Sequence, residues 1–527
     1  MADEASQSLS LKVLVDEETN RVVFAESDHG FVDVLFSFMS MPIGTFIRST
    51  HEQASKWEIG CMNNLYESIE NLDDTHLLSA ECKDMLLRPR SAAEIYCRNL
   101  KLNFVNCTTS NNEYYGCRCG RTECTLFPYP TAHCRCGSPI KYMVKLENSS
   151  SVPPVGGVFV KPTSRFMITD DFQVLPLSTM TVLTLLKELG VVDGTTIKQR
   201  CIKIGNDEVL KMLKASLTSM APFSETVLET EDNKTSVAVG GEEFSPRITT
   251  NESRRAMDTT RSNEAKIDLK LIINKCNNRA LYVEAREDFV NLISSFLTVP
   301  LGFVFKEFPS LSLRGCLANL YKSIQALDVD EFLKSEEMKE TLINPKLAPG
   351  IACNKQLIPI EEALYPSRPT ITSLTSLVER TCSNFKVAST GERFVKGPSK
   401  YMVTDNLTIT PLSLVSGLSL INKLNIPISD IVEREVTISE EEALRLLEAA
   451  LVSRSALTDA LILKEPKQEP KATNLVTDVT EACLGLFLFN DYYVVAESSS
   501  FQKEIEGPWQ VKFELEIQCL LLVVVFG

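Results

Sequence analysis

The sequence predicts an α+β fold built from two tandem repeats, each an antiparallel hairpin or sheet packed with several helices. One observation is a repeat in constant register, in which residues 11–44 return at 269–302 with a Pro-x-Gly motif at Pro42 and Pro300. The other is the order of patterns in each copy, where strand-like alternation comes first and helical spacing follows. No strand–helix–strand alternation demands a parallel sheet, so an antiparallel sheet is expected.

Each copy opens with a predicted hairpin, because Leu11, Val13 and Val15 alternate with polar residues before a polar turn at 17–20. Helical spacing follows at 31–39 and again at 65–72. A strand pair is expected around 159–160 and 166–168, and the last helices at 182–189 and 208–217. Counterparts in the second copy are expected at 267–273, 289–297, 418–424 and 442–451, and a further hairpin at 484–495 in the tail.

Composition predicts the boundaries between these parts. Residues 229–265 are nearly free of large apolar side chains, so burial cannot offset the entropy of ordering them, and we expect a flexible linker there. The proline-containing segment 464–474 is a second linker by the same argument. We therefore expect a disordered N-terminus at 1–8, repeats at 9–228 and 266–463, and a β-rich tail at 475–527.

Charge and hydropathy limit where in the cell the protein is expected and what it is expected to bind. The acidic first residues lack the basic start and apolar stretch of a secretory signal. No apolar run reaches the roughly 18–20 residues of a membrane-spanning helix. We expect an intracellular protein, cytoplasmic or nuclear and not secreted, whose 16 cysteines are mostly reduced thiols. A net charge of −15 disfavours non-specific binding of nucleic acid by the whole chain.

The first copy carries a cysteine-rich insertion at about 97–145. The offset between matching residues falls from 256 at Pro89 and Pro345 to 235 at Phe159 and Phe394, so the first copy is 21 residues longer here. A polar excursion of this length needs a staple, and four thiolates could hold a structural zinc ion. The predicted ligands are Cys117, Cys119, Cys134 and Cys136, with Cys124 and His133 as substitutes because Cys-x-Cys departs from the usual Cys-x-x-Cys. Reduced thiols in a surface loop are the alternative.

Basic and aromatic residues are interleaved in this insertion. They are Arg98, Lys101, Arg118, Arg121, Arg135, Lys141 and Lys145, together with Tyr114, Tyr115, Phe127, Tyr129 and Tyr142. Such a set could bind single-stranded nucleic acid by charge and stacking. A zinc-stapled nucleic-acid module is therefore one alternative function, and a solvated loop with packed tyrosines is the simpler interpretation.

The sequence offers little for catalysis. Four histidines are present and the second copy has none, while no phosphate-binding glycine loop, nucleophile elbow or His-Glu-x-x-His helix occurs. Asp170 and Asp171 could suggest a metal site, but a turn between two strands is the favoured interpretation. Cys61 and Cys316 open equivalent helices, where a nucleophilic thiol is conceivable and a buried packing residue is favoured. No catalytic residue is assigned, and a thiol-dependent enzyme is the second alternative.

Several motifs together resemble one plant family. They are Val-Phe-Ala-Glu at 23–26, Phe-Val-Asp-Val-Leu-Phe-Ser-Phe at 31–38 before Pro-x-Gly, Cys-x-Asn-Asn-Leu-Tyr-Glu-Ser at 61–68, Cys-Arg-Cys-Gly at 134–137 and Ile-Thr-Asp-Asp-Phe-Gln-Val at 168–174. The sequence is similar to the family called domain of unknown function 674 over residues 9–463. The resemblance implies a plant protein and carries no activity. With no retained reactive set, we expect a non-catalytic interaction or regulatory protein with protein partners and no cofactor beyond the structural zinc.

Overall fold

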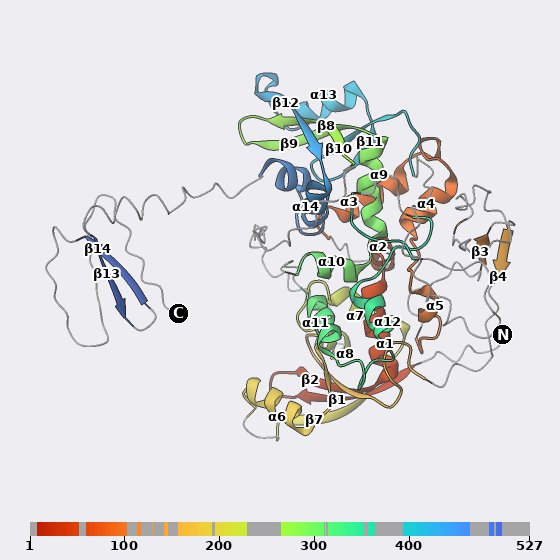
Figure 1. The fold of residues 1–527 in the computed structure, drawn as a ribbon, viewed down its shortest axis with the longest axis vertical. Helices are drawn as coiled ribbons and strands as arrows, with labels where there is room; N and C mark the ends of the chain where they lie inside the picture. The colour runs from red at the N-terminus through yellow and green to blue at the C-terminus, as the bar shows by residue number, and fades with distance from the viewer. Residues whose placement is uncertain are drawn as a thin grey trace. The chain divides into compact units, whose positions relative to one another are not determined.

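The computed structural model describes residues 8–51, 59–102, 113–116, 129, 142–145, 156–191, 195–228, 265–309, 311, 315–351, 357–363, 394–463, 484–489 and 492–497. The chain divides into two compact units, Met1–Ile462 and Leu463–Gly527 (Figure 1). In the second unit the expected hairpin is present, with β13 (Leu484–Phe489) paired antiparallel to β14 (Tyr492–Glu497). We call residues 8–228 the first half and residues 265–463 the second half.

Two five-stranded antiparallel sheets with the same strand order form the framework of the first unit, which confirms the predicted α+β class. The first sheet runs, from edge to edge, β6 (Val174–Pro176), β5 (Arg165–Thr169), β2 (Arg21–Asp28), β1 (Leu9–Asp16) and β7 (Ile197–Ile204). The second runs β11 (Ile409–Pro411), β10 (Lys400–Thr404), β9 (Arg279–Arg286), β8 (Ile267–Asn274) and β12 (Ile431–Ile438).

Both hairpins form because alternating residues bury one face. Leu11, Val13 and Val15 of β1 are buried while their neighbours are partly or fully exposed. At each turn an asparagine takes up the left-handed conformation, Asn20 with φ 50° and Asn278 with φ 52°. Asparagine tolerates this conformation better than most residues, which explains why both turns carry it.

Most of the described helices also occur in equivalent places in the two halves. Those of the first half are α1 (His29–Ser37), η1 (Phe38–Ser40), α2 (Ile43–His51), α3 (Met62–Asn71), η2 (Asp74–His76), α4 (Ala80–Leu87), α5 (Glu94–Cys97), α6 (Thr179–Glu188), α7 (Asn206–Ala215) and α8 (Pro222–Val227). Those of the second half are α9 (Glu287–Ser295), η3 (Phe296–Thr298), α10 (Leu301–Glu307), α11 (Leu317–Ala326), α12 (Glu336–Ile343), α13 (Leu414–Lys423), η5 (Ile428–Asp430), α14 (Glu440–Val452) and η6 (Thr458–Ile462).

The halves meet where the Pro-x-Gly motifs cross. Pro42 and Pro300 form an antiparallel bridge, the amide of Ile43 donates to Val299 O at 2.9 Å, and that of Leu301 donates to Met41 O at 2.9 Å. The glycines of the motif are required by close approach. A Cβ on Gly302 would lie 2.4 Å from Leu342 O and 3.0 Å from Met39 O of the first half. Gly44 is equally confined, with Leu297 O of the second half at 3.0 Å.

Each half also sends a helix onto the other half's sheet. Helix α3 contacts β11, where the amide of Ile409 donates to Ser68 Oγ at 3.0 Å. Helix α11 contacts β6 in the same way, and the amide of Val174 donates to Ser323 Oγ at 2.9 Å. A single hydrophobic core accordingly includes buried residues of both halves, from Leu11 to Ile462.

One expected strand pair differs in the structure. Residues 165–169 form β5, but its hairpin partner is β6, whereas Val160 makes only an isolated bridge to Leu333 of the second half. The physical reason is that the backbone amides of 158–160 donate to the Asp33 carboxylate, so they cannot join a ladder beside β5. Among the residues that the structure describes, no helix is long and apolar enough to cross a membrane.

Candidate functional site

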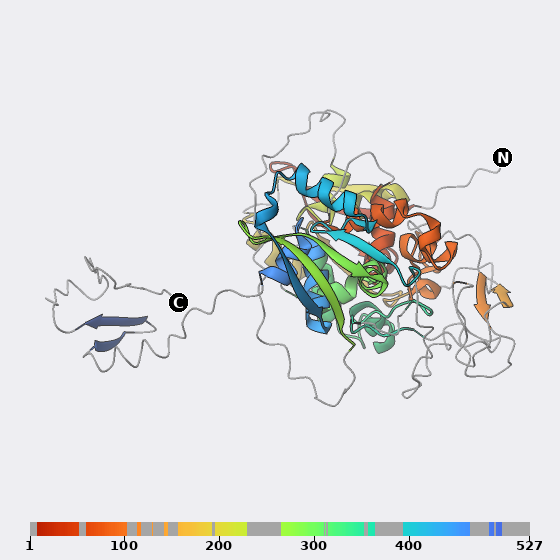
Figure 2. The ribbon, with the colours of Figure 1, turned by 90° about the horizontal axis from the view of Figure 1, so that it is seen from above.

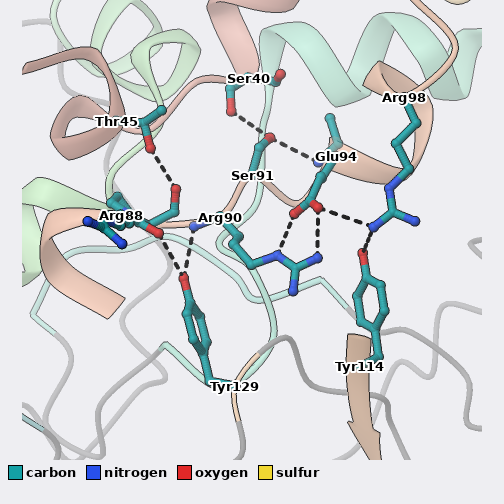
Figure 3. A network of polar contacts seen from close by, with 11 residues as sticks. Ser40, Thr45, Arg88, Arg90, Ser91, Glu94, Arg98, Tyr114 and Tyr129 are labelled. Carbon is teal, nitrogen blue, oxygen red and sulfur yellow. Dashed lines mark hydrogen bonds and ion pairs between the residues drawn. The ribbon is translucent and has the colours of Figure 1, made fainter. Parts of the chain in front are cut away.

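A buried ion-pair network lies at the base of the cysteine-rich insertion (Figure 3). Arg90 and Arg98 flank Glu94 at helical i, i+4 spacing. The Arg90 guanidinium pairs with Glu94 through two contacts, Nε to Oε2 at 2.6 Å and Nη2 to Oε1 at 2.7 Å. Arg98 Nη2 donates to the same Oε1 at 3.2 Å. Such a bidentate pair holds both side chains in one geometry.

Two tyrosines of the insertion complete the network. The ring of Tyr114, in β3 (Glu113–Gly116), lies 4.6 Å from Arg90 Cζ and 5.5 Å from Arg98 Cζ. Its hydroxyl accepts from Arg98 at 3.2 Å. Tyr129 Oη accepts from the Arg90 amide at 2.9 Å and donates to Arg88 O. Both rings are buried and so are unavailable for stacking on bases.

The network carries two positive groups and one negative group in a buried place. Burial alone would lower the pKa of Arg90, but the hydrogen bonds and charge of Glu94 outweigh it and the pKa is raised. Burial raises the pKa of Tyr129, so its hydroxyl stays protonated. In the second half the residue equivalent to Arg90 is Lys346, which makes only a surface ion pair with Glu361. The network therefore belongs to the half that carries the insertion.

The predicted zinc ligands cannot be placed on this framework. Cys117, Cys119, Cys134 and Cys136, with Cys124 and His133, lie outside the described residues. Of the insertion at about 97–145 the structure describes residues 97–102, β3, Tyr129 and β4 (Tyr142–Lys145), which pairs with β3. Within the described ranges no group of three or more histidine, cysteine or acidic side chains could hold a metal ion.

The two equivalent cysteines are buried at contacts between the halves. The amide of Cys61 donates to Ala450 O and its thiol to Ser453 O at 3.0 Å, while the amide of Cys316 donates to Ser216 O. Burial raises the pKa of the Cys61 thiol to about 12 and raises that of Cys316 as well. A thiolate nucleophile needs the opposite shift.

The buried Asp33 carboxylate binds the backbone amides of residues 158–160, the segment that was expected to pair with 166–168. Asp33 Oδ2 accepts from the Val158 amide at 2.7 Å, and Oδ1 accepts from Phe159 and Val160 at 2.8 and 3.0 Å. The side chain is 2% exposed, and burial raises its pKa to about 6 in spite of the three donors. In the second half Asn291 accepts from two amides of the equivalent segment. Because a neutral amide does this work there, the position needs an acceptor rather than an acid.

The adjacent aspartates bind the protein itself, as the favoured turn interpretation predicts. Asp170 accepts from the amide and hydroxyl of Ser224 at 2.9 and 2.7 Å and from Arg21 at 3.2 Å. Asp171 accepts from Thr169 and from Asn319 of the second half. Asp405 makes the matching contacts with Thr458. These acids cap neighbouring segments.

Large apolar side chains are exposed on the outermost helices. Helix α6 has no buried residue, and α13 buries only Gly417 and Ile421. Figures 1 and 2 show α13 lying against one face of the second sheet. The exposed residues on and just after these helices are Met180, Leu183 and Leu189 in the first half and Leu414, Val415, Leu418, Leu424 and Ile428 in the second.

Sequence reasoning missed most of this. The Arg90, Glu94 and Arg98 spacing was a usable signal, since three charges at i, i+4 intervals lie in a segment that also holds Tyr96 and Cys97. Asp33 was another, because it interrupts an otherwise apolar helix. The exposed residues of α6 and α13 gave no signal, because an amphipathic pattern does not tell whether a second apolar face is covered.

Comparison with known proteins adds one match. The model of the family described as "Protein of unknown function (DUF674)" matches residues 5–441. No curated protein and no solved structure matches the chain.

Proposed function

We propose that this chain, which belongs to the DUF674 family, is a non-catalytic binding protein whose contacts are made by the outer helices α6 and α13. The observation that carries the proposal is their exposure. Leu414 is 79% exposed, Val415 77% and Met180 71%. Single exposed apolar residues are ordinary, but several on one surface mark a contact site.

Helix geometry gathers these residues on one side. Leu414 and Leu418 are four residues apart and Val415 and Leu418 three apart, so all three lie on one face of α13. Met180 and Leu183 share a face of α6 in the same way. The opposite face of α6 packs on the first sheet, with Leu185 against the cluster of Phe24 and Met167. In α13 the buried residues are Gly417 and Ile421, so the exposed Leu414 and Leu418 lie beside the packed side of this helix and Val415 lies away from it. Each helix is thus fixed on its sheet by apolar residues and exposes further apolar side chains.

The polar residues that the halves share support a structural role for them. Asn64 and Asn319 donate to Asn406 O and Asp171 O, both at 3.1 Å across the halves. Tyr66 and Tyr321 donate to Leu87 O and Ile343 O, the carbonyls at the ends of α4 and α12. Each of these side chains has a structural partner, and none is directed to a common reaction centre among the described residues.

Site-specific photo-crosslinking tests the proposal. A photoreactive residue at position 415 of the full chain is expected to give a discrete adduct in an extract of its native source, and one at position 180 a second. Position 220 is the matched control, because Met220 is also 50% exposed but lies between α7 and α8. Adducts that are equal at 415 and 220, or none at 415 and 180, would refute the assignment of these faces.

Thiol labelling tests the enzyme alternative. We expect Cys201 and Cys276, which are exposed, to react with an alkylating probe first, and Cys61 and Cys316 to react only on unfolding because they are buried with raised pKa values. Peptide-resolved mass spectrometry over a time course measures the order. Rapid labelling of native Cys61 at pH 6 would favour a thiol-dependent enzyme instead.

A further inference from the structure

We infer that the β13–β14 hairpin joins two copies of this chain, because the outer edge of β13 pairs with the same edge of β13 in a second copy. The resulting sheet has the strand order β14, β13, β13, β14. The inference goes beyond the proposed function and does not depend on it, since it concerns the hairpin of the second unit and not helices α6 and α13.

The hairpin forms a two-stranded sheet of its own. Among the described residues β13 and β14 pair with each other and with no further strand. A lone two-stranded hairpin is at best marginally stable in water, and three or more strands are needed for independent stability. The hairpin therefore needs additional strands beside it.

The two halves show what surrounds a hairpin of this kind. Ala496-Glu497-Ser498 repeats Ala25-Glu26-Ser27 of β2, and leucines alternate along β13 as apolar residues do along β1. In the first sheet β1 and β2 lie in the centre, between β7 and β5, and β8 and β9 lie equally between β12 and β10 in the second. The matching hairpins are thus paired on both sides.

The edges of the two five-stranded sheets are protected against an added strand. Edge strands β6 and β11 are each three residues long and end in a proline, Pro176 or Pro411, which has no amide hydrogen to donate. Edge strands β7 and β12 carry charged residues. These are Lys198, Arg200 and Lys203 in β7 and Glu433, Arg434 and Glu435 in β12. Short strands, prolines and charges all disfavour pairing at an edge.

Strand β13 has none of these protections. Its sequence is Leu-Gly-Leu-Phe-Leu-Phe, without a charge or a proline, whereas β14 carries Glu497. An unprotected strand pairs with another unprotected strand, and every copy of the chain supplies one, β13 itself. Two identical strands that pair antiparallel are related by a two-fold axis, so this contact closes at a dimer.

The register of the hairpin identifies the backbone groups that are available. Phe489 pairs with Tyr492 with only residues 490–491 between them, so these two residues exchange both of their hydrogen bonds. Alternation then directs the amides of Phe487 and Gly485 to β14 as well. The amides that point outward from β13 are those of Leu484, Leu486 and Leu488. Proline at position 486 would remove an outward donor and leave the bonds within the hairpin intact.

Analytical ultracentrifugation of the full chain over a concentration series tests the inference. The wild type is expected to show a monomer–dimer equilibrium with no larger species. Leu486→Pro should raise the dissociation constant of the dimer by about tenfold or more, because the partner strand loses a donor and the edge is distorted. Val495→Pro is the matched control. Val495 pairs with Leu486, so its amide points outward from β14, and this variant should dimerise as the wild type does.

Hydrogen exchange of the wild type gives a second measurement that needs no substitution. A peptide covering 484–489 should exchange more slowly at high than at low protein concentration, because dimerisation covers the outward amides of β13. Circular dichroism of both proline variants checks that the rest of the chain folds.

Three results would overturn the inference. One is a dimer that Val495→Pro weakens and Leu486→Pro does not, which would place the contact at β14. Another is a wild type that stays monomeric at all concentrations or that grows without limit. The third is a dimer that neither variant weakens and in which 484–489 exchanges equally at both concentrations. None of these results bears on the crosslinks expected at positions 180 and 415, so the proposed function is tested separately.

Discussion

Replacing Asp33 with asparagine is expected to remove a pH-dependent loss of stability. The carboxylate is buried and its pKa is raised from 3.8 to about 6. A raised carboxyl pKa means that the folded state holds the proton more tightly than the unfolded chain. Its stabilising contribution is therefore complete below about pH 4 and is lost as the pH rises through about 6.

The magnitude follows from the shift. A difference of about two pKa units corresponds to about 3 kcal/mol of free energy of unfolding, lost by the wild type between pH 4 and pH 7.5 and retained by Asp33→Asn. The variant also loses one acceptor, since an asparagine nitrogen would face the Val158 amide, which costs about 1–3 kcal/mol at every pH. We therefore expect the variant to be the less stable protein at pH 4 and to recover about 3 kcal/mol relative to the wild type by pH 7.5.

Urea unfolding followed by circular dichroism from pH 4 to 7.5 measures this difference. Other groups with raised pKa values, such as Asp170 and Asp405, are common to both proteins and cancel. The second half supplies the reciprocal variant. Asn291→Asp places a carboxylate where two amides donate, and it should introduce the same pH-dependent loss that Asp33→Asn removes. A difference between wild type and Asp33→Asn that is constant with pH would refute the reasoning, and would mean that the amide donors offset the burial of the charge.

Three further predictions concern the core contacts and the insertion. Gly302→Ala should lower the free energy of unfolding, measured by urea unfolding, by about 1–3 kcal/mol, because its Cβ would overlap Leu342 O. Gly156→Ala is the control and should leave the stability unchanged, since nothing lies within 4 Å of its added Cβ; equal losses of stability in the two variants would contradict the close-approach argument. Arg90→Lys should lower the free energy of unfolding by about 2 kcal/mol, since lysine cannot make the bidentate contact with Glu94. Limited proteolysis should then cut the insertion sooner than in the wild type, and unchanged cleavage would show that the network does not anchor the insertion. Elemental analysis of full-length protein purified without chelator should give one zinc per chain, lost in the Cys134→Ser, Cys136→Ser double variant; equal metal content in both proteins would exclude these ligands.

The parts of the fold that the sequence predicts are those whose pattern depends only on burial. The hairpins and α1 are in this class, because alternation or helical spacing records which side of an element meets a core. Strand β7 was missed since it lies at a sheet edge and shows Lys198, Gln199 and Arg200 to solvent. An exposed edge strand has no apolar alternation by which it can be recognised.

The candidate site was less accessible, since periodicity does not say what an element packs against. The helix at 65–72 was expected, but that Ser68 would accept from Ile409 of the other half could not follow from its spacing. The same holds for the amides of 158–160, whose apolar side chains suggest a strand while their donors are taken by Asp33. A backbone hydrogen bond to a distant side chain leaves no periodic trace in the sequence.

Each half packs one helix, α3 or α11, on the sheet of the other half, and this arrangement gives a physical reason for the small and polar residues that both halves share. Gly60 has φ 47°, and a Cβ there would lie 2.4 Å from Ala450 O; a Cβ on Gly315 would lie 2.0 Å from Ser216 O. Each glycine lets the start of α3 or α11 approach the end of the last long helix of the other half. If one half were removed, both the apolar face of α3 and its polar contacts to β11 would meet water. The shared small and polar residues therefore bind the halves to each other, and the insertion, in which the halves differ, is where their functions can diverge.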